Sequence, residues 1–317
     1  MSIWKPLPTI ITKEQVDLPV PVQIRQAART RALLRDAIRI PQEIQYLTQK
    51  FVFQEEIGKG AFSKCYKAQS DSGKVFAIKV QIIKGASERS RARHNVEVFM
   101  HQYLGRHPRF IKHYSSLTDG RNLYIQSELC AKGTLLQYVK AHNGLPMDTA
   151  GKILYSILDA VSFMHSRRIL HRDLKLANIY LDERGNVKVG DFGLACFLPY
   201  GELTKPSKAG TPAYMAPELI NKPHICSFAS DIWALGILMY GMVYVKLPFE
   251  APTTQETAAL VARGTYRFPT IDNRVWNNMI ERILTLRITL RPTANHLFRE
   301  LQVRLTSAAI STPNFAN

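Results

Sequence analysis

The feature that most constrains this chain is a pair of polar motifs separated by a short segment. Residues 171–178 read HRDLKLAN, and residues 191–193 read DFG. Phosphoryl transfer needs little covalent help from a protein, but it needs an aligned nucleophile and neutralised negative charge. Asn178 and Asp191 carry the hard oxygen ligands that suit Mg²⁺. We expect Asp173 to orient an attacking hydroxyl and Lys175 to steady the transferring group, so the pair indicates phosphoryl-transfer chemistry.

A lysine lies inside an apolar strand pattern upstream of these motifs. Lys79 falls within residues 75–83, a mostly apolar run that is typical of a strand. Burying an ammonium group without an anion is costly. Phosphate oxygens would supply that anion, and so would a carboxylate from the helix predicted over residues 88–104. Glu97, on the apolar face of that helix, is the candidate partner.

A glycine-rich turn precedes this strand. Gly58 and Gly60 lack side chains, so backbone N–H groups there could approach phosphate oxygens. The turn alone is a weak signal, because glycine-rich turns are common between strands, and no Gly-Lys-Ser/Thr of a Walker loop follows. The residues that we assign to this nucleotide-binding turn are Ile57, Gly58, Lys59, Gly60, Ala61, Phe62, Ser63, Lys64 and Cys65.

The predicted elements change in character along the chain. Strand patterns separated by turns dominate between Phe51 and Glu128, with one helix over residues 88–104. Beyond Gly133 the patterns are mostly helical, over residues 134–141, 148–166, 231–245, 253–263 and 273–285. The sequence therefore predicts an α+β fold with a small antiparallel β lobe and a larger helical lobe.

With residues 216–218 reading APE, five motifs occur in the order typical of one family. Over residues 51–305 the chain resembles the eukaryotic protein kinase superfamily. The resemblance implies a bilobal kinase fold, with a first lobe over residues 51–128, a hinge over 129–133 and a second lobe over 134–305. It implies ATP as phosphate donor, Mg²⁺ as cofactor and protein substrates.

The resemblance also assigns roles to single residues. It places Lys79, Glu97, Asp173 and Lys175 in catalysis, Asn178 and Asp191 on the metal, and Ala77, Glu128 and Cys130 around adenine. Thr211, in Gly-Thr-Pro, resembles the threonine that contacts the catalytic aspartate, and together with Lys175 it favours serine or threonine over tyrosine as acceptor. Glu218 is expected to pair with Arg291, and Asp231 to brace the catalytic loop.

Some departures from the common kinase pattern point to a subfamily. Ser63 replaces the third glycine of the turn, and Cys65 replaces the usual valine. Both features, with Glu-Leu-Cys at 128–130 and HRDLKLAN, resemble polo-like kinases, which implies a cell-cycle role. NIMA-related kinases are the alternative, followed by Aurora kinases. Residues 306–317 form a short tail, which leaves two interpretations, a fragment of a polo-like kinase or a divergent kinase without polo boxes, and we expect the divergent kinase.

Regulation and substrate preference are predicted from single positions. Ser207 lies between Asp191 and Glu218, where related kinases carry an activating phosphosite, so an upstream kinase could act there; an unmodified loop serine is the other interpretation. Ala177 and Thr134 stand where kinases that require arginine before the target carry acidic residues. We therefore expect no strong upstream-arginine requirement, and the basic surface favours acidic or neutral flanks.

Composition sets the remaining expectations. The net charge is +17, which fits a basic solvated surface or an acidic partner, and we expect no nucleic-acid binding. Residues 1–50 form an N-terminal extension with an arginine-rich segment over residues 22–40. Four scattered cysteines favour a reducing compartment, so we expect an intracellular protein in the cytoplasm or nucleus. We also expect a monomer, and association with the cytoskeleton is one interpretation of its location.

Two further alternatives concern membranes and catalysis. The charge-poor run over residues 232–245 is short for a bilayer span and is interpreted as a buried helix. A pseudokinase that serves as a scaffold is the alternative to an active enzyme. Lys79, Asp173 and Asp191 are all present, which favours catalysis. A small-molecule kinase of related fold is disfavoured by the APE segment.

Overall fold

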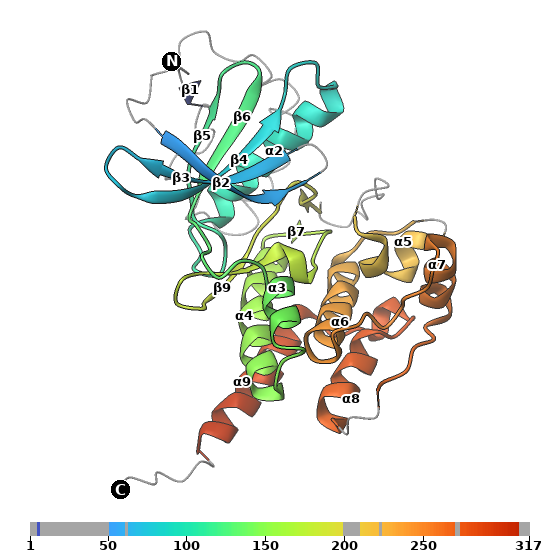
Figure 1. The fold of residues 1–317 in the computed structure, drawn as a ribbon. Helices are drawn as coiled ribbons and strands as arrows, with labels where there is room; N and C mark the ends of the chain where they lie inside the picture. The colour runs from blue at the N-terminus through green and yellow to red at the C-terminus, as the bar shows by residue number, and fades with distance from the viewer. Residues whose placement is uncertain are drawn as a thin grey trace, which may run out of the picture. The chain divides into compact units, whose positions relative to one another are not determined.

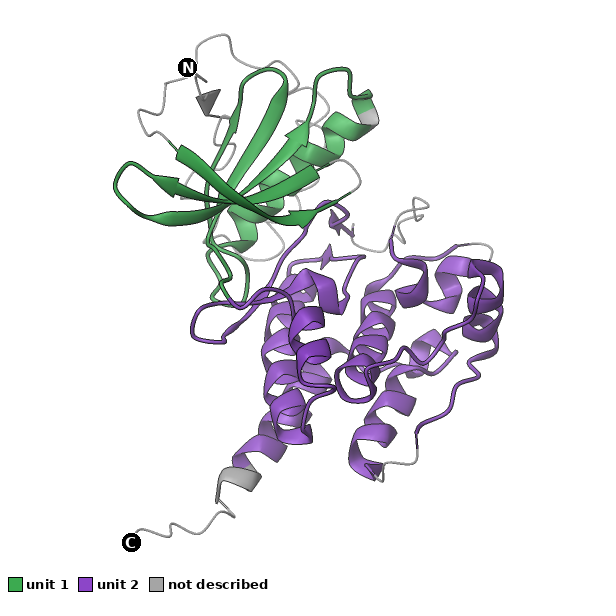
Figure 2. Cartoon of the chain, viewed as in Figure 1, with its two compact units in different colours: residues 1–131 green, residues 132–317 purple. Residues whose placement is uncertain are grey.

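The computed structural model describes residues 5–6, 51–60, 63–198, 210–221, 224–269 and 273–310. The chain divides into two compact units, residues 1–131 and residues 132–317 (Figure 2). The α+β class predicted from the sequence is confirmed, with strands gathered in the first unit and helices in the second (Figure 1). The arginine-rich segment over residues 22–40, for which the sequence composition predicts a helix, lies outside the described residues.

The first unit is built on an antiparallel sheet in the order β1-β5-β6-β4-β3-β2. Its strands are β1 (Lys5–Pro6), β2 (Phe51–Lys59), β3 (Ser63–Ser70), β4 (Val75–Ile82), β5 (His113–Thr118) and β6 (Asn122–Ser127). The sequence pattern predicted the central strands but not β1, because a proline donates no backbone hydrogen bond. Pro6 is compatible with a strand here because β1 lies at the edge of the sheet.

One helix, α2 (Glu88–Leu104), belongs to this unit and has the bounds that the sequence predicted. The Ser87 side chain accepts a hydrogen bond from the backbone of Ser90, which satisfies one of the free N–H groups at the helix start. Val98 of α2 packs with Leu123 and Ile125 of β6 in a buried cluster. This packing orients the adjacent Glu97 toward the strands.

The second unit is mainly helical. Its helices are α3 (Leu135–Ala141), α4 (Met147–Ser166), α5 (Pro217–Ile220), α6 (Phe228–Tyr244), α7 (Thr254–Arg263), α8 (Arg274–Ile283) and α9 (Ala294–Ile310). Short strands β7 (Ile169–Leu170), β8 (Ile179–Leu181), β9 (Val187–Val189) and β10 (Cys196–Phe197) pair as β10-β7 and β8-β9. The sequence pattern did not predict α9, which runs beyond residue 305 to Ile310.

Helix α6 forms the centre of the second unit. Trp233, Leu235 and Ile237 are fully buried. A Cβ atom on Gly236 would lie 2.6 Å from Ile283 Cγ2, so this glycine allows α8 to pack closely. The apolar run over residues 232–245 is thus a core helix. Within the described part of the chain, no helix is both long and apolar enough to cross a membrane.

Candidate active site

The first unit brings Lys79 and Glu97 together. Lys79 lies on β4, and its Nζ is 2.6 Å from Oε1 of Glu97 on α2. The Glu97 side chain is 3% exposed, so its charge needs a close partner. Lys79 keeps 25% of its side-chain surface exposed. The expected partner of the strand lysine is therefore in contact with it.

The glycine-rich turn connects β2 and β3. Its backbone closes with a hydrogen bond of 2.8 Å from the N–H of Gly60 to the carbonyl of Ser63. A Cβ atom on Gly60 would lie 2.8 Å from Ser63 Oγ, so a side chain there would force the turn to move. Ile57, Gly58, Lys59, Ser63, Lys64 and Cys65 are described, whereas Ala61 and Phe62 lie outside the described residues.

Three further residues were assigned to adenine. Ala77 is 7% exposed and pairs with Ser127 of β6 in the sheet register. The backbone N–H of Glu128 donates to the carbonyl of Lys112 at 2.9 Å, and its carboxylate accepts from the N–H of Lys112 at 2.7 Å. Glu128 is thus fixed at the end of β6, and Cys130, which forms no disulfide, follows it.

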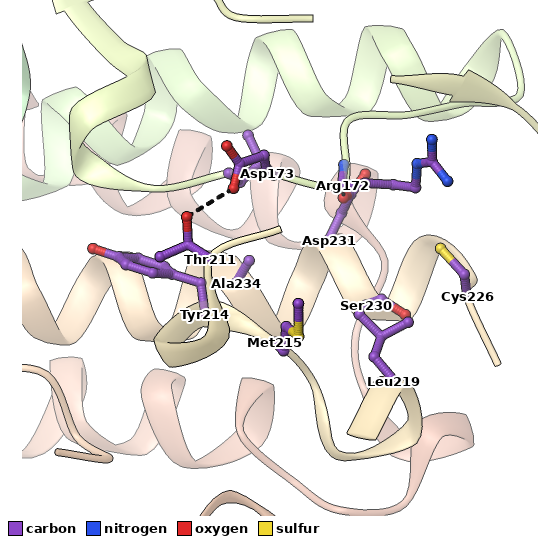
Figure 3. A pocket seen from close by; sticks show the side chains of 11 residues that line it. Arg172, Asp173, Thr211, Tyr214, Met215, Leu219, Cys226, Ser230, Asp231 and Ala234 are labelled. Atoms are coloured by element: carbon purple, nitrogen blue, oxygen red, sulfur yellow. Dashed lines mark hydrogen bonds between the residues drawn. The ribbon is translucent and has the colours of Figure 1, made fainter. Parts of the chain in front are cut away.

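The second unit gathers the catalytic-loop residues around Asp173. Lys175 Nζ is 2.8 Å from Asp173 Oδ2 and donates to Thr211 Oγ1 at 2.8 Å. Thr211 in turn donates to Asp173 Oδ1 at 3.0 Å. Figure 3 shows Thr211 and Asp173 facing each other at a pocket that the catalytic loop, the segment around Thr211 and α6 line together. The loop over residues 171–178, here called the catalytic loop, is therefore joined to the segment between Asp191 and Glu218, here called the activation segment, by a closed ring of hydrogen bonds.

Asn178, at the end of the same loop, also contacts Asp173. Its Nδ2 donates to the carbonyl of Asp173 at 2.8 Å and to Asp173 Oδ2 at 2.9 Å. Its carbonyl accepts from the N–H of Gly190 at 3.0 Å, which ties the loop to the segment that carries Asp191. The amide nitrogen is committed to Asp173, so the amide oxygen is the atom that suits a cation.

The catalytic loop rests on a buried carboxylate at the start of α6. Asp231 is 2% exposed and accepts from the backbone N–H groups of His171 and Arg172, both at 2.9 Å. His165 lies 3.0 Å from the same carboxylate. Arg172 adopts φ of 66°, a conformation that a non-glycine residue rarely takes without support. Asp231 supplies that support, as the sequence predicted.

A buried ion pair fixes the end of the activation segment. Arg291 donates to both oxygens of Glu218, at 2.6 and 2.9 Å, and its side chain is fully buried. It also donates to the carbonyls of Ala229 and Thr285, at 3.0 and 2.9 Å. The guanidinium group is thereby shared between the activation segment and the helices that follow it. The pair expected from the sequence is present.

Comparison with known proteins agrees with this geometry. Residues 51–301 match the protein kinase domain family. The chain belongs to the protein kinase family. Its kinase domain is 32% identical over 266 residues to the serine/threonine-protein kinase polo of Drosophila melanogaster, a match over 81% of this chain. It is 35% identical over 216 residues to the cell cycle serine/threonine-protein kinase CDC5/MSD2 of Saccharomyces cerevisiae, and 34% over 250 to plk-1 of Caenorhabditis elegans.

These matches cover 67% of this chain for the yeast protein and 77% for the nematode protein. The chain spans 45%, 30% and 38% of the lengths of the fly, yeast and nematode relatives. The resemblance to polo-like kinases that the sequence indicated is confirmed for the kinase domain.

The kinase domain holds its assigned residues in two separate groups. Lys79 and Glu97 meet in the first unit, and Asp173, Lys175, Asn178, Thr211 meet in the second. Asp191 follows β9 with φ of 60°. Ser207 lies outside the described residues. The catalytic, metal-binding and regulatory roles of these residues stay predictions.

The Cys65 side chain has two possible roles in the turn, that of a small apolar filler and that of a reactive thiol. Burial raises its pKa to about 11, and the nearby Lys79 charge offsets only part of that rise. The thiolate is the reactive form of cysteine. At neutral pH the Cys65 thiol is therefore protonated, which favours the role of a small apolar filler for this half-buried side chain.

Some contacts of the site were missed from the sequence. His171 is fully buried, and its Nε2 lies 3.1 Å from the carbonyl of Gly190, while Ser230 Oγ donates to Glu218 at 3.1 Å. Gln81 Nε2 donates to Glu97 Oε2 at 2.8 Å. A polar residue inside an apolar strand was the available signal for Gln81, as it was for Lys79.

Asp231 predicts a pH dependence of stability. Burial opposes its charge, but hydrogen bonding and the His165 charge outweigh burial and lower its pKa below the ordinary value. A carboxyl group whose pKa is lower in the folded protein stabilises the fold at every pH above its pKa in the unfolded chain. That stabilisation is lost as the pH falls from the pKa of the unfolded chain through the pKa of the folded protein. We expect Asp231→Asn to lower the melting temperature at pH 7, and the difference from wild type to shrink below about pH 4. A constant difference in thermal melts across pH would contradict this assignment.

Proposed function

We propose that this chain is an ATP-dependent protein kinase that transfers the γ-phosphate of ATP to serine or threonine hydroxyls of proteins. The observation that carries the proposal is the ring of contacts among Asp173, Lys175 and Thr211. A carboxylate held by a lysine and a threonine of the activation segment can accept a hydroxyl proton in a fixed direction. The Lys79–Glu97 pair supports the same activity, because it presents an ammonium group for phosphate oxygens.

Each residue has a separate task in this proposal. Asp173 orients the acceptor hydroxyl and takes its proton as the oxygen–phosphorus bond forms. Lys175 stabilises the charge on the transferring phosphoryl group, and Lys79 holds the phosphates of ATP. Transfer leaves ADP and a phosphorylated side chain. The pseudokinase alternative is disfavoured, because every side chain that this division of labour requires is present.

The site also suits a divalent cation. Mg²⁺ prefers oxygen ligands and is commonly held by few protein groups together with phosphate. Asn178 offers its amide oxygen, since its amide nitrogen donates to Asp173. Asp191 offers a carboxylate on the segment that Asn178 contacts through Gly190. When bound, Mg²⁺ neutralises phosphate charge.

Incubation with γ-labelled ATP, Mg²⁺ and casein tests the proposal. We expect label to enter casein, to stop on addition of EDTA, and to be recovered as phosphoserine or phosphothreonine. A kinase-dead pseudokinase would bind nucleotide without transfer. Absence of transfer to casein and to a degenerate peptide array, in the presence of Mg²⁺ or Mn²⁺, would refute the activity.

Substrate selection is proposed to lack a strong demand for arginine before the target residue. Neither of the two positions that could bind a substrate arginine offers a carboxylate. Ala177, next to Asn178, is apolar, and the Thr134 side chain caps the N-terminus of α3. The net charge of +17 favours acidic or neutral flanks. We expect a degenerate peptide array to show no upstream position at which arginine dominates. A dominant upstream arginine on that array would contradict this proposal.

Phosphorylation of Ser207 by an upstream kinase is proposed to raise activity. Arg172 sits next to Asp173, and a guanidinium group forms strong hydrogen bonds with phosphate. We expect Ser207→Ala to lower the rate of peptide phosphorylation relative to the phosphorylated wild-type chain. Mass spectrometry would establish the modification in parallel. Full activity in both the Ser207→Ala chain and phosphatase-treated wild type would exclude this regulation.

The wider role rests on the relatives. Their names describe polo-like and cell-cycle serine/threonine kinases. We propose a cell-cycle role for this chain as a monomer acting inside the cell, in the cytoplasm or nucleus and in contact with the cytoskeleton, without nucleic acid as a partner. None of the four cysteines forms a disulfide, which supports a reducing compartment. Localisation of the tagged full chain through the cell cycle would test the assignment.

A further inference from the structure

We propose that Gln81 is a positioning residue that holds Glu97 in place on Lys79, an inference that rests on the proposed kinase activity. Gln81 Nε2 donates to Glu97 Oε2 at 2.8 Å, while Lys79 Nζ contacts Glu97 Oε1 at 2.6 Å. The two oxygens of one carboxylate are therefore held by two residues of the same strand. Lys79 and Gln81 are two positions apart on β4, so their side chains share one face of the sheet.

Burial makes the second contact necessary. The Glu97 side chain is 3% exposed, and Gln81 is 5% exposed. A carboxylate buried to that degree needs a donor on each oxygen, since an unpaired oxygen loses its water without compensation. Lys79 contacts one of the two oxygens, Oε1, at 2.6 Å. Gln81 supplies a donor to the other from a position that the strand fixes.

The chemistry of the side chain suits this task. An amide donor is neutral, so it satisfies Glu97 without adding a second cation that would compete with Lys79 for the carboxylate. The amide oxygen, Gln81 Oε1, adds no stabilisation here, because it is buried and has no hydrogen-bond partner among the described residues. An apolar residue would avoid that cost. The retained benefit of glutamine is its contact with Glu97.

The consequence for the enzyme is a helix held ready before nucleotide arrives. Lys79 must divide its hydrogen bonds between Glu97 and phosphate oxygens once ATP is bound. Glu97 then depends more on Gln81, and α2 keeps its position against β4. Without Gln81, Glu97 can rotate away, and Lys79 loses the partner that directs it.

A matched pair of variants tests the role. Gln126 of β6 is the control, because it is also a buried glutamine of this sheet and accepts from Ser115 at 2.7 Å. It pairs with Ile78 in the register, one position before Lys79, and therefore faces the opposite side. We expect Gln81→Leu to lower kcat/KM for ATP by roughly tenfold, the scale of one charge-assisted hydrogen bond. Gln126→Leu should lower it by about twofold or less.

Hydrogen exchange separates this inference from the proposed activity. We expect the backbone of α2 to exchange faster in nucleotide-free Gln81→Leu than in Gln126→Leu. If wild type transfers no phosphate while this difference is seen, the activity fails and the positioning role stands. If wild type is active and the two leucine variants match each other in kcat/KM and in α2 exchange, the positioning role is wrong.

An isosteric variant covers the case in which leucine prevents folding. In Gln81→Glu the new carboxyl group can donate to Glu97 only while the two acids share a proton. Lys79 and His94 also lie beside this cluster, and both are present in the variant and in wild type. The activity of Gln81→Glu relative to wild type should therefore fall as pH rises, while Gln126→Glu keeps a constant ratio. A pH-independent ratio for Gln81→Glu would overturn the inference.

Discussion

Replacing Asp173 with asparagine is expected to lower the rate of phosphate transfer by roughly 10²–10⁴-fold, the range of a lost general base. The carboxylate accepts hydrogen bonds from Lys175, Thr211 and Asn178. An asparagine amide cannot take the proton of an acceptor hydroxyl. The NH₂ group of the asparagine amide would also face Lys175, Thr211 or Asn178, which are themselves hydrogen-bond donors. Initial rates with labelled ATP and a peptide substrate measure the effect.

Asp148→Asn provides the control for this substitution. Asp148 is an exposed carboxylate in the first turn of α4, and it undergoes the same chemical change. We expect its rate to stay within about twofold of wild type, because surface substitutions away from a site have small effects. Circular dichroism should show both variants folded. A similar loss in both variants, or no loss in either, would remove Asp173 from catalysis.

Removing Arg291 is expected to give the largest loss of stability, about 3–5 kcal/mol in the free energy of unfolding. Arg291→Met leaves the Glu218 carboxylate buried beside Ser230 without its cation. The carbonyls of Ala229 and Thr285 lose their donor in the same change. Urea titration of the full chain, followed by tryptophan fluorescence, measures the effect.

Arg282→Met is the matched comparison. Arg282 also pairs with a carboxylate, contacting Glu300 at 2.9 Å, but 44% of its side chain is exposed. Solvent competes with an exposed pair, so its loss should cost about 1 kcal/mol or less. Equal losses for Arg291→Met and Arg282→Met would mean that burial does not govern the contribution of the Glu218–Arg291 pair.

The chemistry of this chain was easier to predict from sequence than the contacts that support it. Lys79 stands out in the sequence because a charged residue in an apolar strand must have a partner of opposite charge. Asp173 stands out because it lies within a recognisable motif. Helix α2 was predictable with its bounds, since Ser87 and Glu88 mark its start and apolar positions follow at helical spacing. Helices α4 and α6 of the second unit were predictable for the same reason, whereas α9, which is as long as α6, was not predicted.

Other features depended on long-range packing and could not be derived from local patterns. The hydrogen bond from Gln81 to Glu97 joins a strand to a helix, and sequence spacing carries no information about it. The β1 edge strand depends on pairing with β5, against the local preference of Pro6. The contact of His171 with Gly190 likewise requires the folded catalytic loop.

The central claim, transfer from ATP to a protein hydroxyl, is tested most directly by identifying the labelled amino acid. Wild type and Asp173→Asn would be incubated side by side with γ-labelled ATP, Mg²⁺ and casein, and the casein would then be hydrolysed in acid. We predict labelled phosphoserine or phosphothreonine from wild type and only background label from Asp173→Asn. Equal label from the two proteins, or no label on a hydroxyl amino acid from wild type, would contradict the assignment.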